Sequence, residues 1–296
     1  MSIARSESRL GLIFLTPALL LVFCLSIFPL FMSLGLSFVH WNISNPASGI
    51  RWAGLSHWAR LWGDDHFHVV LRNTLLYVLV GIPLQYGLGL LLAAALDREI
   101  RGRNWLRVLF LVPMMMSPVV VAFIVGRVMF NEAVGPINAG LQVLGFGTVP
   151  WLTDSVMAFV TVILIDTWQW TPFFMLVLLA GFSALPKEVE EAAALDTVSD
   201  RQIFWRVVFP MLMPWTVTAI LIRTIEMLKI VDVIVVLTNG GPGIATESLS
   251  LYAYRVGIVN FDLGYAAVLA FSLLIIAILL ATGFLLLTRR FVQRAT

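Results

Sequence analysis

The chain has 296 residues, of which 60% are hydrophobic and 12% are charged, and its formal net charge is +2. Soluble domains carry about 25% charged residues, so this composition, with a mean hydropathy of +0.94, excludes a soluble globular protein. The single cysteine, Cys24, excludes an intrachain disulfide and a cysteine-based zinc site.

Six apolar runs follow one another along the chain, and each is near or above the length of about 20 residues that crosses a bilayer as a helix. They cover residues 11–38, 73–96, 108–130, 156–182, 215–237 and 264–288. The first run contains Pro17 and Pro29 and is longer than the apolar core of a signal peptide, so we expect it to be retained as a span. The sequence therefore predicts an all-α polytopic membrane protein with six transmembrane helices.

The connection between the first two runs, residues 40–72, is polar and rich in tryptophan, a residue that collects at the membrane–water interface. It holds all four histidines, including the pair His66 and His68. Because no further ligand accompanies that pair, we expect an ordinary surface segment and no metal site.

Lysine and arginine are distributed unevenly between the two sets of connections. One set, which includes both chain ends, carries Arg5, Arg9, Arg98, Arg101, Arg103, Arg107, Lys187, Arg201, Arg206, Arg289, Arg290 and Arg294. The other set carries Arg51, Arg60 and Arg255, with Arg72 at a boundary. Because basic residues near spans stay in the cytoplasm, we expect both termini on the cytoplasmic side.

The segment between the fourth and fifth runs is a long polar stretch, and residues 191–210 read EAAALDTVSDRQIFWRVVFP. Glutamate before a run of alanine favours a thin helix with negative charge at its N-terminus. A thin helix fits a groove on another protein, and either Asp196 or Ser199 can cap a second helix behind it. The alternative is an ordinary amphipathic surface helix.

This segment resembles the coupling loop of the membrane subunits of bacterial ABC importers, whose pattern is EAA, three residues, Gly, nine residues and I-x-L-P. The residues that the resemblance assigns to the contact with a partner ATPase are Glu191, Ala192, Ala193, Asp196, Thr197 and Pro210, and all of them except Asp196 stand at defined positions of the pattern. Thr197 stands where the pattern has glycine, which implies a different turn because glycine permits a left-handed conformation.

The resemblance extends over most of the chain to the MalF-like permeases of sugar, polyol and glycerol-phosphate importers. It rests on RNTLLYVLVGIPLQYGLGLLLAAALDREIRGRNWLRVLFLVP, on DTWQWTPFFMLVLLAGFSALPKEVEEAA and on LTNGGPGIATESLSLYAYR. It implies the type I ABC importer permease fold, with a transmembrane core over residues 72–289 and a coupling loop over residues 184–214. The N-terminal tail, first span and first external loop are then residues 1–71, and the cytoplasmic tail is residues 290–296.

The resemblance also implies an assembly in a bacterial inner membrane. Its other members would be a second homologous permease subunit, a dimer of ATPase subunits and an extracytoplasmic solute-binding protein. The chain contains no GxxxxGK[ST] phosphate loop, so we expect ATP and Mg²⁺ to be bound by the ATPase. We expect no cofactor, no enzymatic activity and no nucleic-acid partner for this chain.

Charged residues within the fifth run are candidates for a solute path. Arg223, Glu226, Lys229 and Asp232 alternate in sign at three-residue spacing. Residues at this spacing can pair on a helix, so these charges either neutralise one another and fix helix packing or contact solute. Under the second hypothesis we expect Glu226 and Lys229 to line the path.

Asp166, Gln169 and Trp170 of the fourth run form a second group of candidates. A carboxylate, an amide and an indole suit a polyhydroxylated solute, because hydroxyls need donors and acceptors and the apolar face of a sugar lies well on an aromatic ring. We expect them to border a cavity shared with the sister subunit, and subunit packing is the alternative.

The segment TNGGPG after the fifth run is too rich in glycine for a span, and its glycines permit a tight turn. The resemblance assigns Asn239, Gly240, Gly241 and Pro242 to an external loop near the binding protein.

Two other functional classes compete with an importer subunit. An ion-coupled secondary transporter would use the intramembrane carboxylates as proton or cation sites, but it needs no helix that docks on an ATPase. An intramembrane enzyme lacks a nucleophile–base pair here, since no histidine falls within a span. The sequence favours a permease subunit that forms half of the path for a sugar or related solute in an ATP-driven, binding-protein-dependent importer.

Overall fold

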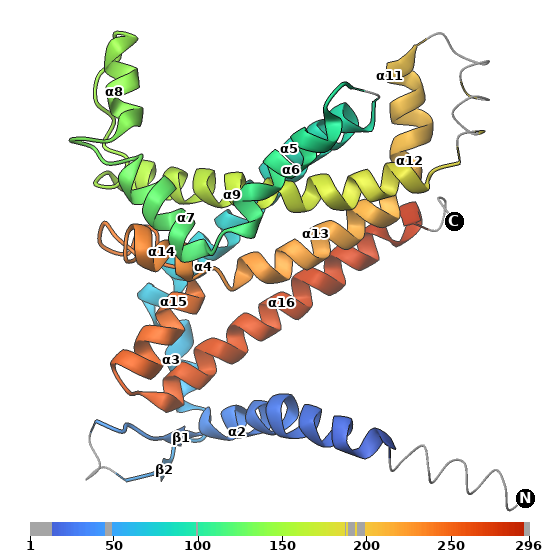
Figure 1. The fold of residues 1–296 in the computed structure, drawn as a ribbon. Helices are drawn as coiled ribbons and strands as arrows, with labels where there is room; N and C mark the ends of the chain where they lie inside the picture. The colour runs from blue at the N-terminus through green and yellow to red at the C-terminus, as the bar shows by residue number, and fades with distance from the viewer. Residues whose placement is uncertain are drawn as a thin grey trace, which may run out of the picture. The chain divides into compact units, whose positions relative to one another are not determined.

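The computed structural model describes residues 14–44, 49–98, 100–186, 188, 193 and 199–292, and Figure 1 draws its fold. The chain divides into two compact units. The first comprises Met1–Asp64 with Ala253–Ser272, and the second comprises Asp65–Tyr252 with Leu273–Thr296.

The first unit contains the N-terminal span, a short hairpin and the start of the last helix. Its elements are the helix Phe14–Leu36, which includes η1 (Phe23–Ile27) and α2 (Phe28–Leu36), then β1 (Val39–His40), β2 (Arg51–Trp52), α3 (Ser56–Trp62), η6 (Arg255–Val259) and the first turns of α16 (Leu263–Val292). The two strands pair antiparallel, with Val39 opposite Trp52. Arg60 joins the two segments of this unit, because it pairs with Asp262 at 3.3 Å and lies 3.9 Å from the centre of the Tyr265 ring.

The second unit is built from helices that run along one another. Its elements are α4 (Asp65–Leu76), η3 (Tyr77–Gly81), α5 (Ile82–Asp97), α6 (Arg103–Met115), α7 (Pro118–Val121), η4 (Ala122–Val128), α8 (Pro136–Val143), α9 (Ser155–Ala184), α11 (Asp200–Ile203), η5 (Phe204–Val208), α12 (Phe209–Met211), α13 (Met213–Leu228), α14 (Asp232–Leu237), α15 (Leu249–Tyr254) and the later turns of α16. Asp154 caps α9, since its side chain accepts hydrogen bonds from the backbone of Val156 and Met157. Figure 1 shows α8 and α11 at opposite ends of α9.

Four described helices are long and apolar enough to cross a membrane, namely Phe14–Leu36, Asp65–Asp97, Ser155–Ala184 and Leu263–Arg289. Two bent pairs, Arg103–Met115 with Pro118–Val128 and Arg201–Met211 with Met213–Leu228, bring the number to six when each pair is counted as one span. The predicted all-α membrane fold is confirmed, and the six predicted spans correspond to these six segments.

The second span differs from its predicted form, and the third is a sharply bent pair of helices. The second begins at Asp65, because residues 65–72 of the predicted connection form the first turns of α4. The third is bent by 94° between Met115 and Pro118. Proline disfavours a helical conformation in the residue before it, and Ser117 accordingly has an extended backbone with ψ of 136°.

The predicted fifth span, residues 215–237, is interrupted. The helix α13 ends at Leu228, where the Lys229 amide donates to the Glu226 carbonyl in a tighter turn, and α14 begins at Asp232. Between them Val231 has φ of −135°, outside the helical range. We name residues 229–231 the helix break.

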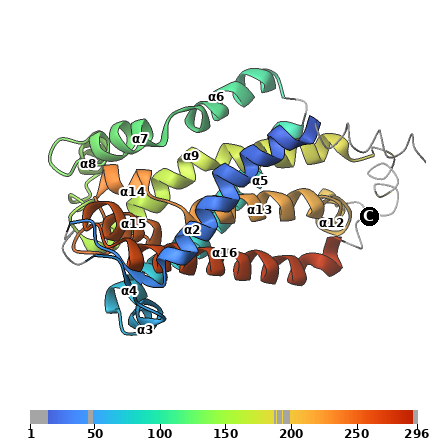
Figure 2. The ribbon, with the colours of Figure 1, turned by 90° about the horizontal axis from the view of Figure 1, so that it is seen from below.

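The core of the second unit lies where α5 and α13 pack against α9, and Figure 2 shows α13 beside α9 from below. A glycine makes the closest approach between α5 and α9 possible. A Cβ atom added at Gly89 would overlap the Cβ of Phe174 and would lie 3.0 Å from the amide nitrogen of Met175. The two helices can therefore be this close only because position 89 has no side chain.

We predict that Gly89→Ala lowers the free energy of unfolding by about 1–3 kcal/mol, the usual range for overpacking a core. The measurement is the midpoint of thermal unfolding of the purified protein in detergent. Gly87→Ala is the matched control, because Gly87 lies on the same helix with nothing within 4 Å of its added Cβ. A control that loses as much stability as Gly89→Ala would show that helix contact is not the cause.

Candidate functional site

Three side chains from three helices form a closed hydrogen-bonded network in the second unit. Gln85 of α5 donates from Nε2 to Asp166 Oδ2 of α9 at 2.7 Å. Arg223 of α13 donates from Nη2 to the same Asp166 oxygen at 2.5 Å and from Nε to Gln85 Oε1 at 2.9 Å. We name these three residues the buried triad.

The triad is shielded from solvent within the chain, since Gln85 is 0%, Asp166 is 2% and Arg223 is 3% exposed. The lowest published scales give a free-energy cost of about 3 kcal/mol for an isolated charge in the middle of a membrane. The opposite charges and the amide satisfy one another here, so the triad holds α5, α9 and α13 in one arrangement.

The hypothesis of a charge ladder along the fifth span is therefore only partly correct. Arg223 pairs with Asp166 on another helix and not with its neighbour Glu226. Glu226 pairs instead with Lys229 at 3.0 Å, and these two side chains are 51% and 56% exposed. An exposed pair of this kind contributes little to stability, so Glu226 and Lys229 are available for another role.

A hollow of about 210 Å³ lies between the triad and the helix break. Its charged lining residues are Asp166, Arg223, Glu226, Lys229 and Asp232, and its other lining comes from Pro118, Trp170 and residues 230, 231 and 233. The structure thus brings together four of the five residues predicted for the solute path, namely Asp166, Trp170, Glu226 and Lys229.

Trp170 is half-buried at the edge of this hollow. The Arg223 guanidinium lies over its ring, 4.6 Å from the ring centre, a distance typical of cation–π contacts. Since the triad fixes Arg223, the same contact also fixes the plane of the indole.

The fifth predicted residue, Gln169, does not line the hollow. Its Nε2 donates to the Met116 carbonyl at 3.2 Å, at the bend between α6 and α7, and the residue is 1% exposed. One helical position turns a side chain by about 100°, which places Gln169 on a different side of α9 from Trp170. The expectation that Gln169 borders the cavity therefore does not match its position.

Gln85 is the member of the site that the sequence analysis missed. It lies within the second apolar run, in the sequence GIPLQYGLG. A polar amide inside a membrane span usually has a buried partner, so its position was the signal that could have identified it.

The segment that begins TNGGPG is a compact loop packed within the second unit. The Gly241 amide donates to the Thr238 carbonyl at 3.0 Å, and the Thr246 amide donates to the Gly240 carbonyl at 3.1 Å. Asn239 and Gly240 have φ of 48° and 81°, in the left-handed region, which explains asparagine and glycine at these two positions. Residues 246–248 are 0% exposed, so the loop is held along much of its length.

Most of the predicted coupling residues lie outside the described part of the chain. They are Glu191, Ala192, Asp196 and Thr197. Ala193 is helical, and Pro210 lies in the first turn of α12, where proline is tolerated. Aromatic rings of η5 and α12 pack on one another, and the ring centres of Trp205 and Phe209 are 4.9 Å apart.

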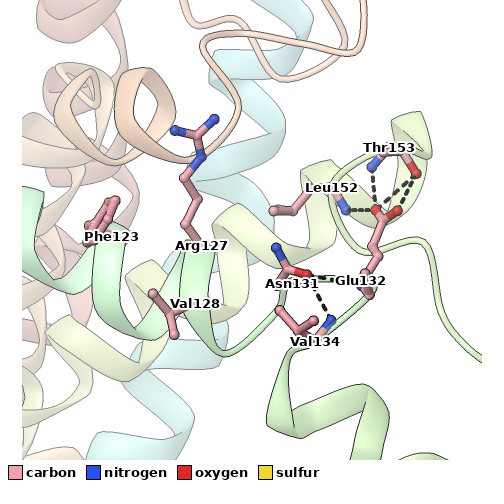
Figure 3. A pocket seen from close by; sticks show the side chains of 9 residues that line it. Phe123, Arg127, Val128, Asn131, Glu132, Val134, Leu152 and Thr153 are labelled. Carbon is pink, nitrogen blue, oxygen red and sulfur yellow. Dashed lines mark hydrogen bonds between the residues drawn. The ribbon is translucent and has the colours of Figure 1, made fainter.

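A second and larger hollow of about 670 Å³ lies where the third span meets the loop before α9, as Figure 3 shows. Its charged residues are Arg127 and Glu132. The Glu132 carboxylate already has hydrogen-bond partners, because its Oε1 accepts from the backbone amides of Leu152 and Thr153 at 2.8 Å. Burial raises the pKa of Glu132, but these hydrogen bonds outweigh it and the pKa is lowered from its ordinary value. The remaining lining is mainly apolar, so this hollow offers a hydroxylated solute fewer partners than the smaller one.

Helices of spanning length, bent spans and charges held inside a helical core define a polytopic membrane protein with a polar interior. The match to a known family is specific: residues 85–296 match the binding-protein-dependent transport system inner membrane component family. The chain belongs to this family, which supports the importer hypothesis over the ion-coupled secondary transporter.

Individual relatives agree with this assignment. The chain is 37% identical over 236 residues to a probable ABC transporter permease protein, y4oQ, of Sinorhizobium fredii, covering 80% of this chain and 76% of that protein. It is 32% identical over 271 residues to the trehalose/maltose transport system permease protein MalF of Thermococcus litoralis, covering 91% of each. A solved bacterial alginate ABC transporter contains a chain of the same fold, with a TM-score of 0.83 at 20% identity, covering 97% of this chain and 96% of that one.

We predict that Asp166→Asn lowers the free energy of unfolding by about 3–5 kcal/mol, because Arg223 is left buried without a counter-charge. The triple variant Gln85→Leu/Asp166→Leu/Arg223→Leu should recover much of that loss, since apolar replacement of the whole buried network leaves none of its polar groups unpaired and is often neutral. Thermal unfolding midpoints of the purified variants measure both effects.

Glu226→Gln is the control, because the exposed pair with Lys229 is worth about 1 kcal/mol or less. Equal losses in Asp166→Asn and Glu226→Gln would contradict the role assigned to the buried triad.

Proposed function

We propose that this chain forms half of the translocation path for a neutral polyhydroxylated solute, such as a sugar, in an ATP-driven importer. Asp166, Trp170, Glu226 and Lys229 border that path. The observation that carries the proposal is the hollow at the helix break, which combines an aromatic ring with charges of both signs inside a membrane-spanning unit.

The lining suits hydroxyl groups in chemical terms. The Glu226 carboxylate accepts hydrogen bonds, the Lys229 ammonium donates them, and both are about half exposed. The ring of Trp170 offers an apolar surface for the C–H face of a sugar. Arg223 is a poor candidate for binding an anion, because Asp166 and Gln85 already occupy two of its donor nitrogens. These features favour a neutral solute over a phosphate ester.

The size of the hollow favours a half-site. Complete small-molecule sites have volumes of roughly 300–1,000 Å³, and this one is about 210 Å³. A second, homologous permease subunit would supply the other half. A dimer of ATPase subunits would bind ATP and Mg²⁺, and an extracytoplasmic solute-binding protein would deliver the solute. The alginate transporter was solved in complex with a periplasmic protein that carries an alginate pentasaccharide, which supports the last of these partners.

The orientation follows from the distribution of charge. Basic residues concentrate at both termini and around residues 187–206, so we place these parts in the cytoplasm and Asn239, Gly240, Gly241 and Pro242 on the outer side. The segment with Glu191, Ala192, Ala193, Asp196, Thr197 and Pro210 then faces the ATPase and couples ATP hydrolysis to transport.

We expect Trp170→Ala to reduce solute uptake by about tenfold or more, because the solute loses its aromatic contact and Arg223 loses the ring beneath it. The assay is uptake of radiolabelled maltose, trehalose and glycerol by proteoliposomes that contain the whole transporter. Trp168→Ala is the matched control, since Trp168 lies two residues away on α9, is 42% exposed and does not line the hollow. Normal uptake by Trp170→Ala would remove this residue from the path.

Glu191→Lys should weaken docking of the ATPase while the permease remains inserted, because charge reversal would remove an ion pair with the ATPase. Co-purification of the ATPase and the ratio of ATP hydrolysed to solute transported are the two measurements. Glu188→Lys changes the same charge outside the EAA pattern and serves as the control. Intact co-purification and normal coupling in Glu191→Lys would contradict the assignment.

A further inference from the structure

We propose that Ser248 and Ser250 are positioning residues, which connect the outer loop to the wall of the solute hollow; this rests on the proposed function. The outer loop is defined here as residues 238–248. The wall is the stretch 226–233, which includes the helix break and most of the charged lining.

The helix break leaves carbonyl groups without their usual helical partners. The last carbonyls of a helix have no intrahelical donor, and α13 ends at Leu228. Two serine hydroxyls supply donors. Ser250 Oγ donates to the Leu228 carbonyl at 3.1 Å, and Ser248 Oγ donates to the Ile230 carbonyl at 2.6 Å.

Ser248 is fixed in place by its surroundings. Its side chain is 0% exposed, and its oxygen also accepts a hydrogen bond from the Leu251 amide at 3.2 Å. Because it both donates and accepts, the hydroxyl cannot rotate away without leaving two polar groups unpaired. The carbonyl of Ile230 therefore follows the position of Ser248.

The outer loop is in turn bonded to α4 and η3. Asn73 Nδ2 donates to the carbonyls of Ile244 and Glu247, both at 3.1 Å, and the Tyr77 hydroxyl donates to the Thr246 carbonyl at 2.9 Å. These side chains are 2% and 0% exposed. These three hydrogen bonds hold the outer loop against α4 and η3, so we expect a displacement of the loop to be passed on to the residues bonded to it.

These bonds form a continuous mechanical connection from the loop surface to the hollow. Asn239 and Gly243 are exposed on the loop, where a partner can contact it. A shift of the loop changes the geometry at Leu228 and Ile230, and with it the positions of Glu226, Lys229 and Asp232. Docking of the solute-binding protein would then alter the solute hollow without touching it.

The test uses the complete transporter in proteoliposomes with its binding protein and whichever of maltose, trehalose and glycerol the wild type takes up. The variants are Ser248→Ala, Ser250→Ala and the double variant. The control is Ser272→Ala, which removes a buried hydroxyl that donates within its own helix, to the Leu269 carbonyl at 2.7 Å.

We expect the stimulation of ATP hydrolysis by the loaded binding protein to fall by about 3- to 10-fold in Ser250→Ala, the range for loss of one hydrogen bond, and by more in the double variant. The basal rate of ATP hydrolysis of the double variant should equal that of the wild type. The Ser272→Ala variant should show wild-type stimulation by the binding protein. Ser248→Thr, which keeps a hydroxyl, should restore part of the stimulation.

A second measurement reports on the wall itself. Val231→Cys in a Cys24→Ala background is modified by a small thiol reagent, and the binding protein should change the rate of modification. The double serine variant should abolish that change. A normal change together with normal stimulation in the double variant overturns the proposal.

If Ser248→Ala does not assemble, the half-buried Ser250→Ala decides the question by the same two measurements. A wild-type complex that takes up none of the three solutes and shows no stimulation would contradict the proposed function instead. The two failures are thus distinguishable.

Discussion

A buried ion pair in apolar surroundings is the constraint on which the second unit depends. Asp166 and Arg223 come from different helices, and neither charge is tolerable inside a membrane without the other. Gln85 bonds to both, so the distances among α5, α9 and α13 are set by polar contacts as well as by packing. Gly89 allows the backbones of α5 and α9 to approach closely, and this close approach brings the triad within hydrogen-bonding distance.

The same constraint separates two kinds of charge in the fifth span. Arg223 bonds to Gln85 and Asp166 on two other helices, whereas Glu226 and Lys229 pair with each other at the surface of the hollow. A sequence pattern of alternating charges thus contains one structural residue and a pair that remains accessible. The helix break begins at Lys229, and Glu226 lies three residues after Arg223, within one helical turn of it.

Part of this arrangement could be predicted from the sequence. The apolar runs gave the spans because their lengths match the bilayer, and the polar residues inside two of these runs pointed to the hollow. The partner of Arg223 could not be predicted, since it depends on how α9 and α13 are rotated against each other. For the same reason the sequence did not separate Gln169 from Trp170, which lie on different sides of α9. Pro118 in the sequence indicates that the third span is interrupted. The angle of 94° could not be predicted, because it depends on tertiary packing.

The contact between Arg223 and Trp170 has a stereochemical consequence. A planar indole has two faces, and the guanidinium covers one of them. Under the proposed function, a ring-shaped solute that stacks on Trp170 would use the remaining face. Because the two sides of a sugar ring differ in where their hydroxyl groups project, a single open aromatic face would favour the sugar side from which fewer hydroxyl groups project.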